Sequence, residues 1–182
     1  MRITDFWYFI PIAMTASLYP SIITLRDSNY GEYLSRYRHM LSSFALISIG
    51  IGILLTFASD FIIQFLYGAK YDGVSPILIV NVWTGLFVFL DIGISNWFIT
   101  ESLQRFVLRR TIIGAFTNII LNFIFIPQFG AIGASVATLV TQFFISYLMN
   151  GLYSKTREVF ILQTNALLFL PKFVLTLLQR TF

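Results

Sequence analysis

The chain has 182 residues, of which 57% are hydrophobic and only 11% are charged. A soluble domain rarely exceeds half apolar residues, so this composition excludes an ordinary soluble domain and predicts an integral membrane protein. The net charge of +4 does not indicate nucleic-acid binding, because the basic residues sit in short segments between apolar runs. Without cysteine, the chain has no disulfide, thiolate metal site or thiol nucleophile.

Five apolar runs are of the length that crosses a bilayer, since about 20 residues rising ~1.5 Å each match a hydrocarbon core of ~30 Å. We therefore predict an all-α, polytopic membrane helix bundle that forms one domain over residues 1–182. The predicted spans cover residues 6–25, 40–59, 76–100, 111–126 and 131–153. The fourth of these is too short to cross the bilayer unless the side chains of Arg109 and Arg110 extend toward the headgroups.

The first predicted span carries two possible helix interruptions. Pro11 and Pro20 each remove a backbone donor, so we expect a kink or break that serves either packing or a transport hinge. The polar segment 26–39 leads into the second span. After that span, Asp60 is typical of an N-cap for a short helix over residues 61–67, which we expect to lie in the membrane interface.

A polar stripe runs along one side of the third predicted helix at 100° per residue. It contains Asp91, the one ionisable residue well inside a span. Such a stripe either bonds to neighbouring helices or lines a water-filled cavity, and an intramembrane carboxylate favours the cavity. The stripe consists of Asn81, Thr84, Asp91, Ser95 and Asn96.

Residues 111–153 read as two apolar runs joined by the uncharged turn Pro127-Gln128-Phe129-Gly130. So short a connection predicts an antiparallel helical hairpin. Small and amide residues share one face of each arm, where they permit close packing and interhelical hydrogen bonds. They are Thr111, Gly114, Asn118 and Asn122 on the first arm, and Ala134, Ala137, Thr138 and Thr141 on the second.

Basic residues alternate between the two ends of the predicted bundle. Segments 26–39, 101–110 and 154–158 carry eight Lys and Arg, whereas the other end carries Arg2 and Lys70. Because cytoplasmic loops are enriched in these residues, the arginine-rich end is predicted to be cytoplasmic. In the tail 159–182, Pro171-Lys172 interrupts the middle, so a helix on the cytoplasmic surface is favoured over a sixth span.

Motifs of catalysis are missing from the sequence, which has no HExxH, P-loop or Gly-x-Ser-x-Gly. The single histidine, His39, lies at the predicted water boundary without a partner histidine or cysteine. We therefore expect no enzyme, no cofactor and no bound metal. Missing motifs alone do not exclude a subunit of a membrane glycosyltransferase.

The turn region also carries a family resemblance. Residues 121–134, LNFIFIPQFGAIGA, followed by Ala137-Thr138, resemble the penultimate hairpin of bacterial polysaccharide (O-antigen) flippases. Shorter segments similar to this family follow its order: WYFIP at 7–11, LYPS at 18–21, FLYG at 65–68 and KTR at 155–157. The resemblance implies the C-terminal half of the fold shared with the multidrug and toxin extrusion antiporters. Because the first half of these transporters has almost no counterpart in this chain, we expect the chain to be a fragment of a longer transporter.

By this resemblance, the expected function is alternating-access transport of an undecaprenyl-diphosphate-linked oligosaccharide across the bacterial inner membrane. Membrane lipid, the lipid-linked oligosaccharide, a polysaccharide polymerase and a chain-length regulator are the expected partners. The polar stripe of the third predicted helix, together with Asn118 and Asn122, would line the substrate cavity. At the cytoplasmic mouth, Arg105, Arg109 and Arg110 would attract the diphosphate or anchor the topology. A cation antiporter that uses Asp91, and a remnant without transport, are the alternatives.

Overall fold

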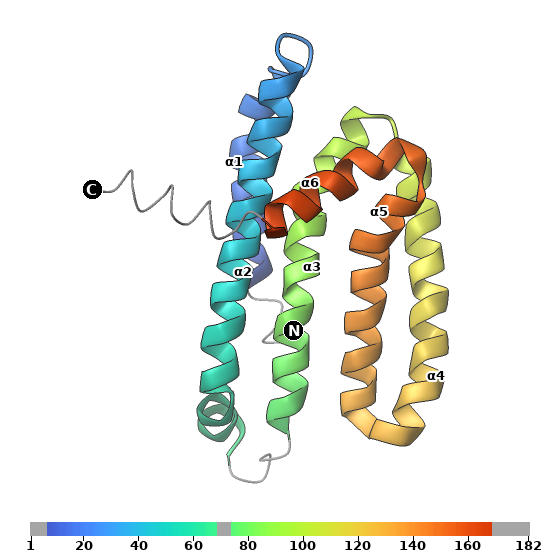
Figure 1. The fold of residues 1–182 in the computed structure, drawn as a ribbon. Coiled ribbons are helices and arrows are strands. Elements are labelled where there is room, and N and C mark those ends of the chain that lie inside the picture. The colour runs from blue at the N-terminus through green and yellow to red at the C-terminus, as the bar shows by residue number, and fades with distance from the viewer. Residues whose placement is uncertain (1–6, 69–73, 169–182) are drawn as a thin grey trace, which may run out of the picture.

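The computed structural model describes residues 7–68 and 74–168, and the regular structure in these ranges is helical (Figure 1). This confirms the predicted all-α membrane bundle. Three helical stretches are long and apolar enough to cross a membrane, namely Tyr30–Phe65, Ser75–Thr100 and Gln104–Leu152. The helices are α1 (Phe9–Ile23), α2 (Tyr30–Tyr67), α3 (Ser75–Thr100), α4 (Gln104–Phe143), α5 (Met149–Leu152) and α6 (Arg157–Leu168), with a π-helical turn at Phe144–Leu148 and a 3-10 turn at Ser154–Thr156.

The first helix is continuous through both prolines, so the expected break is wrong. Pro11 lies in the first turn of α1, where backbone donors have no partner inside the helix and a missing N–H costs little. Pro20 lies in the last turn before the helix ends at Ile23. With 15 residues, α1 is shorter than the predicted span 6–25. The hinge role of Pro11 and Pro20 stays a prediction.

The second helix extends beyond the predicted span 40–59 at both ends. Asn29 caps its start, because its side-chain oxygen accepts a hydrogen bond from the Glu32 N–H at 3.1 Å. At the other end, α2 continues through Asp60 to Tyr67, so the separate helix capped by Asp60 is wrong. Ile63 is buried in a small cluster with α3 residues, which explains why the helix continues. Its last turns, seen nearly end-on in Figure 1, bend away from the axis of the rest of α2.

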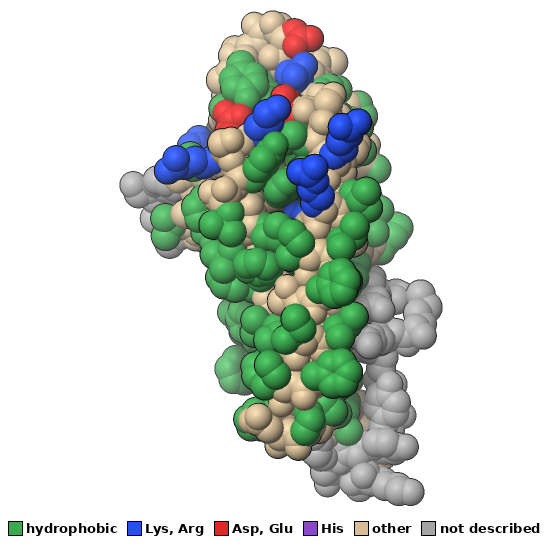
Figure 2. Space-filling model, turned by 90° about the vertical axis from the view of Figure 1, so that its right-hand side faces the viewer, with side chains coloured by type: hydrophobic (Ala, Val, Ile, Leu, Met, Phe, Trp, Pro, Cys, Tyr) green, Lys and Arg blue, Asp and Glu red, His purple; other side chains and the backbone are tan. Residues whose placement is uncertain are grey.

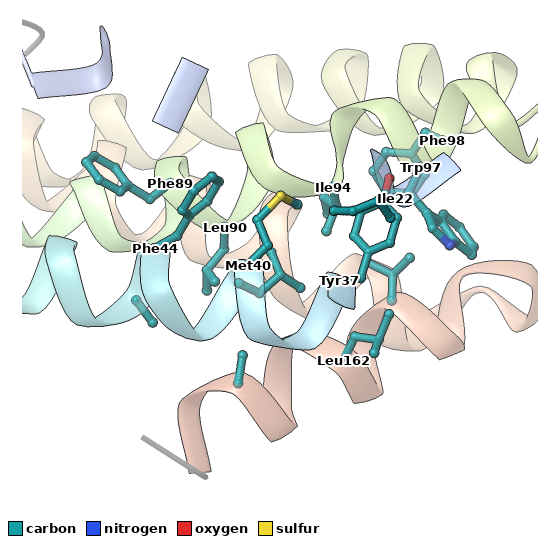
Figure 3. Packing of buried hydrophobic residues seen from close by; sticks show 14 of the residues in the cluster. Ile22, Tyr37, Met40, Phe44, Phe89, Leu90, Ile94, Trp97, Phe98 and Leu162 are labelled. Carbon is teal, nitrogen blue, oxygen red and sulfur yellow. The ribbon is translucent and has the colours of Figure 1, made fainter. Parts of the chain in front are cut away.

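The main core lies between α2 and α3, with α1 and α6 packed against it (Figure 3). Phe44 and Phe89 meet edge to face, with their ring centroids 6.4 Å apart. Gly93 permits this approach, since a Cβ atom there would lie 2.8 Å from a methyl carbon of Leu41. Close packing of this kind holds membrane helices together, because lipid tails are as apolar as the side chains they would cover.

The predicted hairpin is confirmed within α4, which reverses direction at Gly130 (Figure 1). Gly130 has φ 58° and ψ −135°, a conformation that is nearly exclusive to glycine. A Cβ atom on Gly133 would collide with the carbonyl oxygen of Phe125, so the two arms meet backbone to backbone. Farther along, Gly114 packs against Ile145 of the other arm, as its place on the predicted small-residue face requires. Thr111, by contrast, is exposed.

Side-chain contacts join three connections at one end of the bundle. Arg26 binds Glu101 through two contacts, Nε to Oε1 at 2.9 Å and Nη2 to Oε2 at 3.2 Å. The Tyr30 hydroxyl donates to Glu158 Oε2 at 2.6 Å. The three basic segments therefore lie at the same end, as predicted, and Figure 2 shows Lys and Arg gathered there above an apolar surface. Arg2 and Lys70 lie outside the described residues.

The last described helix, α6, lies across the bundle rather than along it (Figure 1). Its described part, Arg157–Leu168, measures about 18 Å at ~1.5 Å per residue. One side is buried in the main core through Val159, Leu162 and Ala166. The surface helix expected over 159–182 stays a prediction, because Pro171 and Lys172 lie outside the described residues.

We predict that Gly133→Ala destabilises the hairpin strongly, because the new methyl group collides with backbone that cannot move aside. We expect a loss of at least about 2 kcal/mol in the free energy of unfolding, as for overpacked sites. Gly50→Ala is the matched control, since nothing lies within 4 Å of its added Cβ atom. Denaturant unfolding in detergent micelles measures both, and equal stabilities would contradict the backbone contact.

Candidate functional site

Asp91 and Arg110 form an ion pair inside the bundle. Arg110 Nη1 lies 2.8 Å from Asp91 Oδ1, and the two side chains are 6% and 27% exposed. Asp91 comes from α3 and Arg110 from the second turn of α4. The guanidinium carbon also lies 5.1 Å from the ring centroid of Phe98, which adds a cation–π contact. The intramembrane carboxylate therefore has a cationic partner.

The position of Arg110 differs from that of the other two arginines of the predicted cytoplasmic mouth. The helix α4 begins at Gln104, so Arg105 and Arg109 lie on its first turns rather than in a loop, and both are exposed. Positions four apart share a helix face, whereas the next residue is turned by about 100°. Arg110 accordingly points into the bundle and is 5% exposed.

The other residues of the predicted α3 stripe lie in different surroundings. The Asn81 amide donates to Ser135 Oγ on the second hairpin arm at 3.3 Å. The hydroxyls of Thr84 and Ser95 donate to carbonyls of their own helix, and Thr84 is buried while Ser95 is exposed. Asn96 is partly buried. The structure thus brings Asn81 and the carboxylate of Asp91 against the α4 hairpin and leaves Ser95 at the surface.

The two asparagines of the first arm bond inside the hairpin. Asn118 Nδ2 donates to Thr141 Oγ1 across the arms at 3.2 Å, and Asn122 Nδ2 donates to Asn118 Oδ1 at 2.9 Å. Among the described residues, the buried Oδ1 atom of Asn122 has no hydrogen-bond partner. These amides therefore join the arms in this conformation, and their place in a substrate cavity stays a prediction.

A second polar cluster, absent from the predicted site, surrounds the π-helical turn. Ser146, Asn150 and Gln163 are all fully buried. The Ser146 carbonyl accepts from Asn150 Nδ2 at 2.8 Å and from Gln163 Nε2 at 3.0 Å, while Gln142 Nε2 donates to Ser146 Oγ at 2.7 Å. The only sequence signal was the presence of amide side chains in apolar stretches, with Gln142 and Asn150 in the fifth predicted span and Gln163 in the tail.

The cluster and the ion pair adjoin each other. Arg110 Nη1 also donates to the carbonyl of Ile145, in the π-helical turn, at 3.4 Å. Amides, hydroxyls and one compensated charge thus form a polar path from α3 through the hairpin to α6. This is chemistry suited to hydrogen bonding a polar solute. Within the described ranges, no three His, Cys, Asp or Glu residues are grouped to hold a metal ion.

Two curated proteins are similar to the chain. Over 149 residues it is 30% identical to the probable flippase AglR of the archaeon Haloferax volcanii, an alignment covering 78% of this chain and 30% of that protein. Over 139 residues it is 28% identical to an uncharacterized membrane protein of Methanocaldococcus jannaschii, covering 74% and 27% of the two chains. The match thus spans less than a third of either relative. The chain matches no family model and no solved structure.

Replacing both partners of the ion pair, Arg110→Met with Asp91→Asn, should destabilise the protein less than Arg110→Met alone. Arg110→Met leaves the Asp91 charge unpaired inside the bundle, and we expect a loss of about 3 kcal/mol in the free energy of unfolding, because breaking a buried pair typically costs ~3 to 5 kcal/mol and Asp91 is partly exposed. Adding Asp91→Asn should restore at least about half of this loss.

Chemical unfolding in micelles measures the cycle. The matched control is Arg109→Met, an exposed neighbour that should change stability by no more than about 0.5 kcal/mol. An additive double variant would show that the two side chains contribute independently.

Proposed function

We propose that this chain forms part of a flippase for lipid-linked oligosaccharides. The observation that carries the proposal is the polar path centred on the Asp91–Arg110 pair, inside a bundle of apolar helices. A flippase must move a sugar head group through hydrocarbon while the lipid tail stays in the membrane. Intramembrane polar groups of this kind mark solute pathways, and similarity to a probable flippase covers 78% of the chain.

The interhelical hydrogen bonds supply groups that a sugar can use. Asn81 is bonded to Ser135, and Asn118 to Thr141, at 3.3 Å and 3.2 Å. Such contacts contribute only about 0.6 to 2 kcal/mol in membranes. When the hairpin separates from α3 during transport, Asn81 exchanges its partner for a sugar hydroxyl, and Asn118 does the same when the two arms of the hairpin move apart. Asn122, whose side-chain oxygen is already unbonded in the described structure, accepts from the sugar.

The diphosphate is attracted at the basic end. Arg105 and Arg109 are exposed there, on one face of α4, and make no ion pair with the described residues. Their charges face the headgroup level, where a phosphate of the lipid carrier lies. In this proposal they collect the substrate, and Arg110 belongs to the interior of the path.

The narrower form of the proposal concerns the substrate. It is an undecaprenyl-diphosphate-linked repeat unit, such as O-antigen for lipopolysaccharide biosynthesis, moved by alternating access across a bacterial inner membrane. A polymerase and a chain-length regulator would then act on the product. This form rests on the sequence resemblance alone, since the name of the Haloferax volcanii relative specifies neither the sugar nor the lipid carrier.

The ion pair weighs against the cation antiporter. A cation bound at Asp91 would have to replace a guanidinium whose nitrogen lies 2.8 Å from the carboxylate. Export that depends on a proton or sodium gradient through Asp91, with no effect on glycan, would favour the antiporter.

We expect Asp91→Asn to lower export of the surface glycan about tenfold, which corresponds to ~1.4 kcal/mol in a transport barrier. The change is made at the native chromosomal locus, where any further parts of the transporter are present. Surface glycan and protein abundance are both measured. Asp27→Asn, at a side chain that is 93% exposed, is the control and should export normally. Wild-type glycan and abundance in Asp91→Asn would remove the functional role of the carboxylate.

A further inference from the structure

The π-helical turn Phe144–Leu148 changes where its backbone carbonyls are directed. The Met149 N–H bonds to the carbonyl of Phe144, five residues back, whereas an α-helix bonds four residues back. The wider turn leaves neighbouring carbonyls able to accept side-chain donors. Ile145 accepts from Arg110 of the first hairpin arm, and Ser146 accepts from Gln163 of α6. The turn is therefore held from two sides.

Two amides hold the Ser146 carbonyl and each other. Asn150 Nδ2 donates both to this carbonyl at 2.8 Å and to Gln163 Oε1 at 3.0 Å. The Thr156 hydroxyl in turn donates to the Asn150 carbonyl at 2.8 Å. All four residues are fully buried, so water does not compete for these bonds. The place of α6 against the bundle is thereby tied to the shape of the turn.

We propose that Gln163 and Asn150 are positioning residues for the Asp91–Arg110 ion pair. By holding the Ser146 carbonyl they keep the turn in its π form, and this keeps the adjacent Ile145 carbonyl directed at the guanidinium. The Ile145 side chain is fixed as well, since it fills the space beside Gly114, one turn after Arg110 on the facing arm. The importance of this arrangement for transport rests on the proposed function, whereas the positioning itself does not.

The composition of the cluster supports a positioning role over packing alone. The Oδ1 atom of Asn150 is buried without a hydrogen-bond partner among the described residues. A buried polar network that is not fully satisfied is less stable than an apolar core of the same shape. Packing would therefore be served better by leucine or methionine, and the amides are explained by the carbonyl that they hold.

The test compares two glutamines that contact the same residue. Gln163→Met removes the donor to the Ser146 carbonyl, while the control, Gln142→Met, removes only a donor to the Ser146 hydroxyl. The full chain is labelled with ¹⁵N-arginine and placed in lipid nanodiscs. Exchange of the Arg110 guanidinium protons with D₂O is then followed by NMR, with the signal assigned by its loss in Arg110→Lys.

We expect exchange at Arg110 to become about fivefold faster in Gln163→Met, the factor that one hydrogen bond of ordinary net strength supplies, and to stay unchanged in Gln142→Met. If Gln163→Met does not fold, Asn150→Ala tests the same carbonyl by removing its other donor. Wild-type exchange in a folded Gln163→Met or Asn150→Ala protein would overturn the proposal. No substrate enters this measurement, so a failed export assay with faster exchange at Arg110 would reject the proposed function and leave the positioning intact.

Discussion

The contact between Asp91 and Arg110 is the constraint on which the packing of α3 against the α4 hairpin depends. An unpaired aspartate costs about 2.5 to 3.5 kcal/mol at the centre of a membrane helix, and Asp91 lies well inside α3. Arg110 lies nearer a helix end, in the second turn of α4, but it is buried. Pairing compensates both buried charges, and it favours the rotation of α3 and the first arm that brings the two side chains together. In that rotation Asn81 faces the second arm and bonds to Ser135.

The two sides of the bundle are held together by different forces. Between α2 and α3 the contact is an aromatic and aliphatic core, in which Phe44 and Phe89 are fully buried. The hairpin joins α3 through aromatic contacts, such as that between Phe87 and Phe143, and in addition through the ion pair and the Asn81 bond, while its arms are joined through Asn118 and Thr141. Packed apolar side chains have no equivalent partner in a polar substrate, whereas hydrogen bonds can be exchanged for bonds to water or sugar. The polar contacts of the hairpin are therefore the ones that water or another polar group can replace.

Local signals in the sequence were sufficient to predict the hairpin but not to predict the buried polar contacts that its arms make. The turn at Gly130 was predictable, because proline and glycine between two apolar runs leave few other conformations. The inward direction of Asp91 followed from the cost of a charge in lipid. The partner of Asp91 could not be predicted in the same way, because Arg109 and Arg110 are neighbours in the sequence. Their side chains point in different directions only because both residues lie on helix α4, which begins at Gln104. Asp60 shows the same limit: an N-cap and a mid-helix aspartate look alike until the packing of Ile63 is known. The π-helical turn has no local signal, because the contacts that hold it come from Arg110 and Gln163.

Arg110 gives the site a chemistry that the carboxylate alone would not have. A guanidinium stays protonated at any physiological pH, so the pair opens only when Asp91 is neutralised or when another anion takes its place. Phosphate is such an anion, because its oxygens match the paired donors of arginine. A small cation would instead approach a fixed positive charge. Asp91 alone would leave an uncompensated negative charge in the bundle, whereas Arg110 places a permanent cation beside it. The electrostatic character of the site thus depends on the pair rather than on either residue.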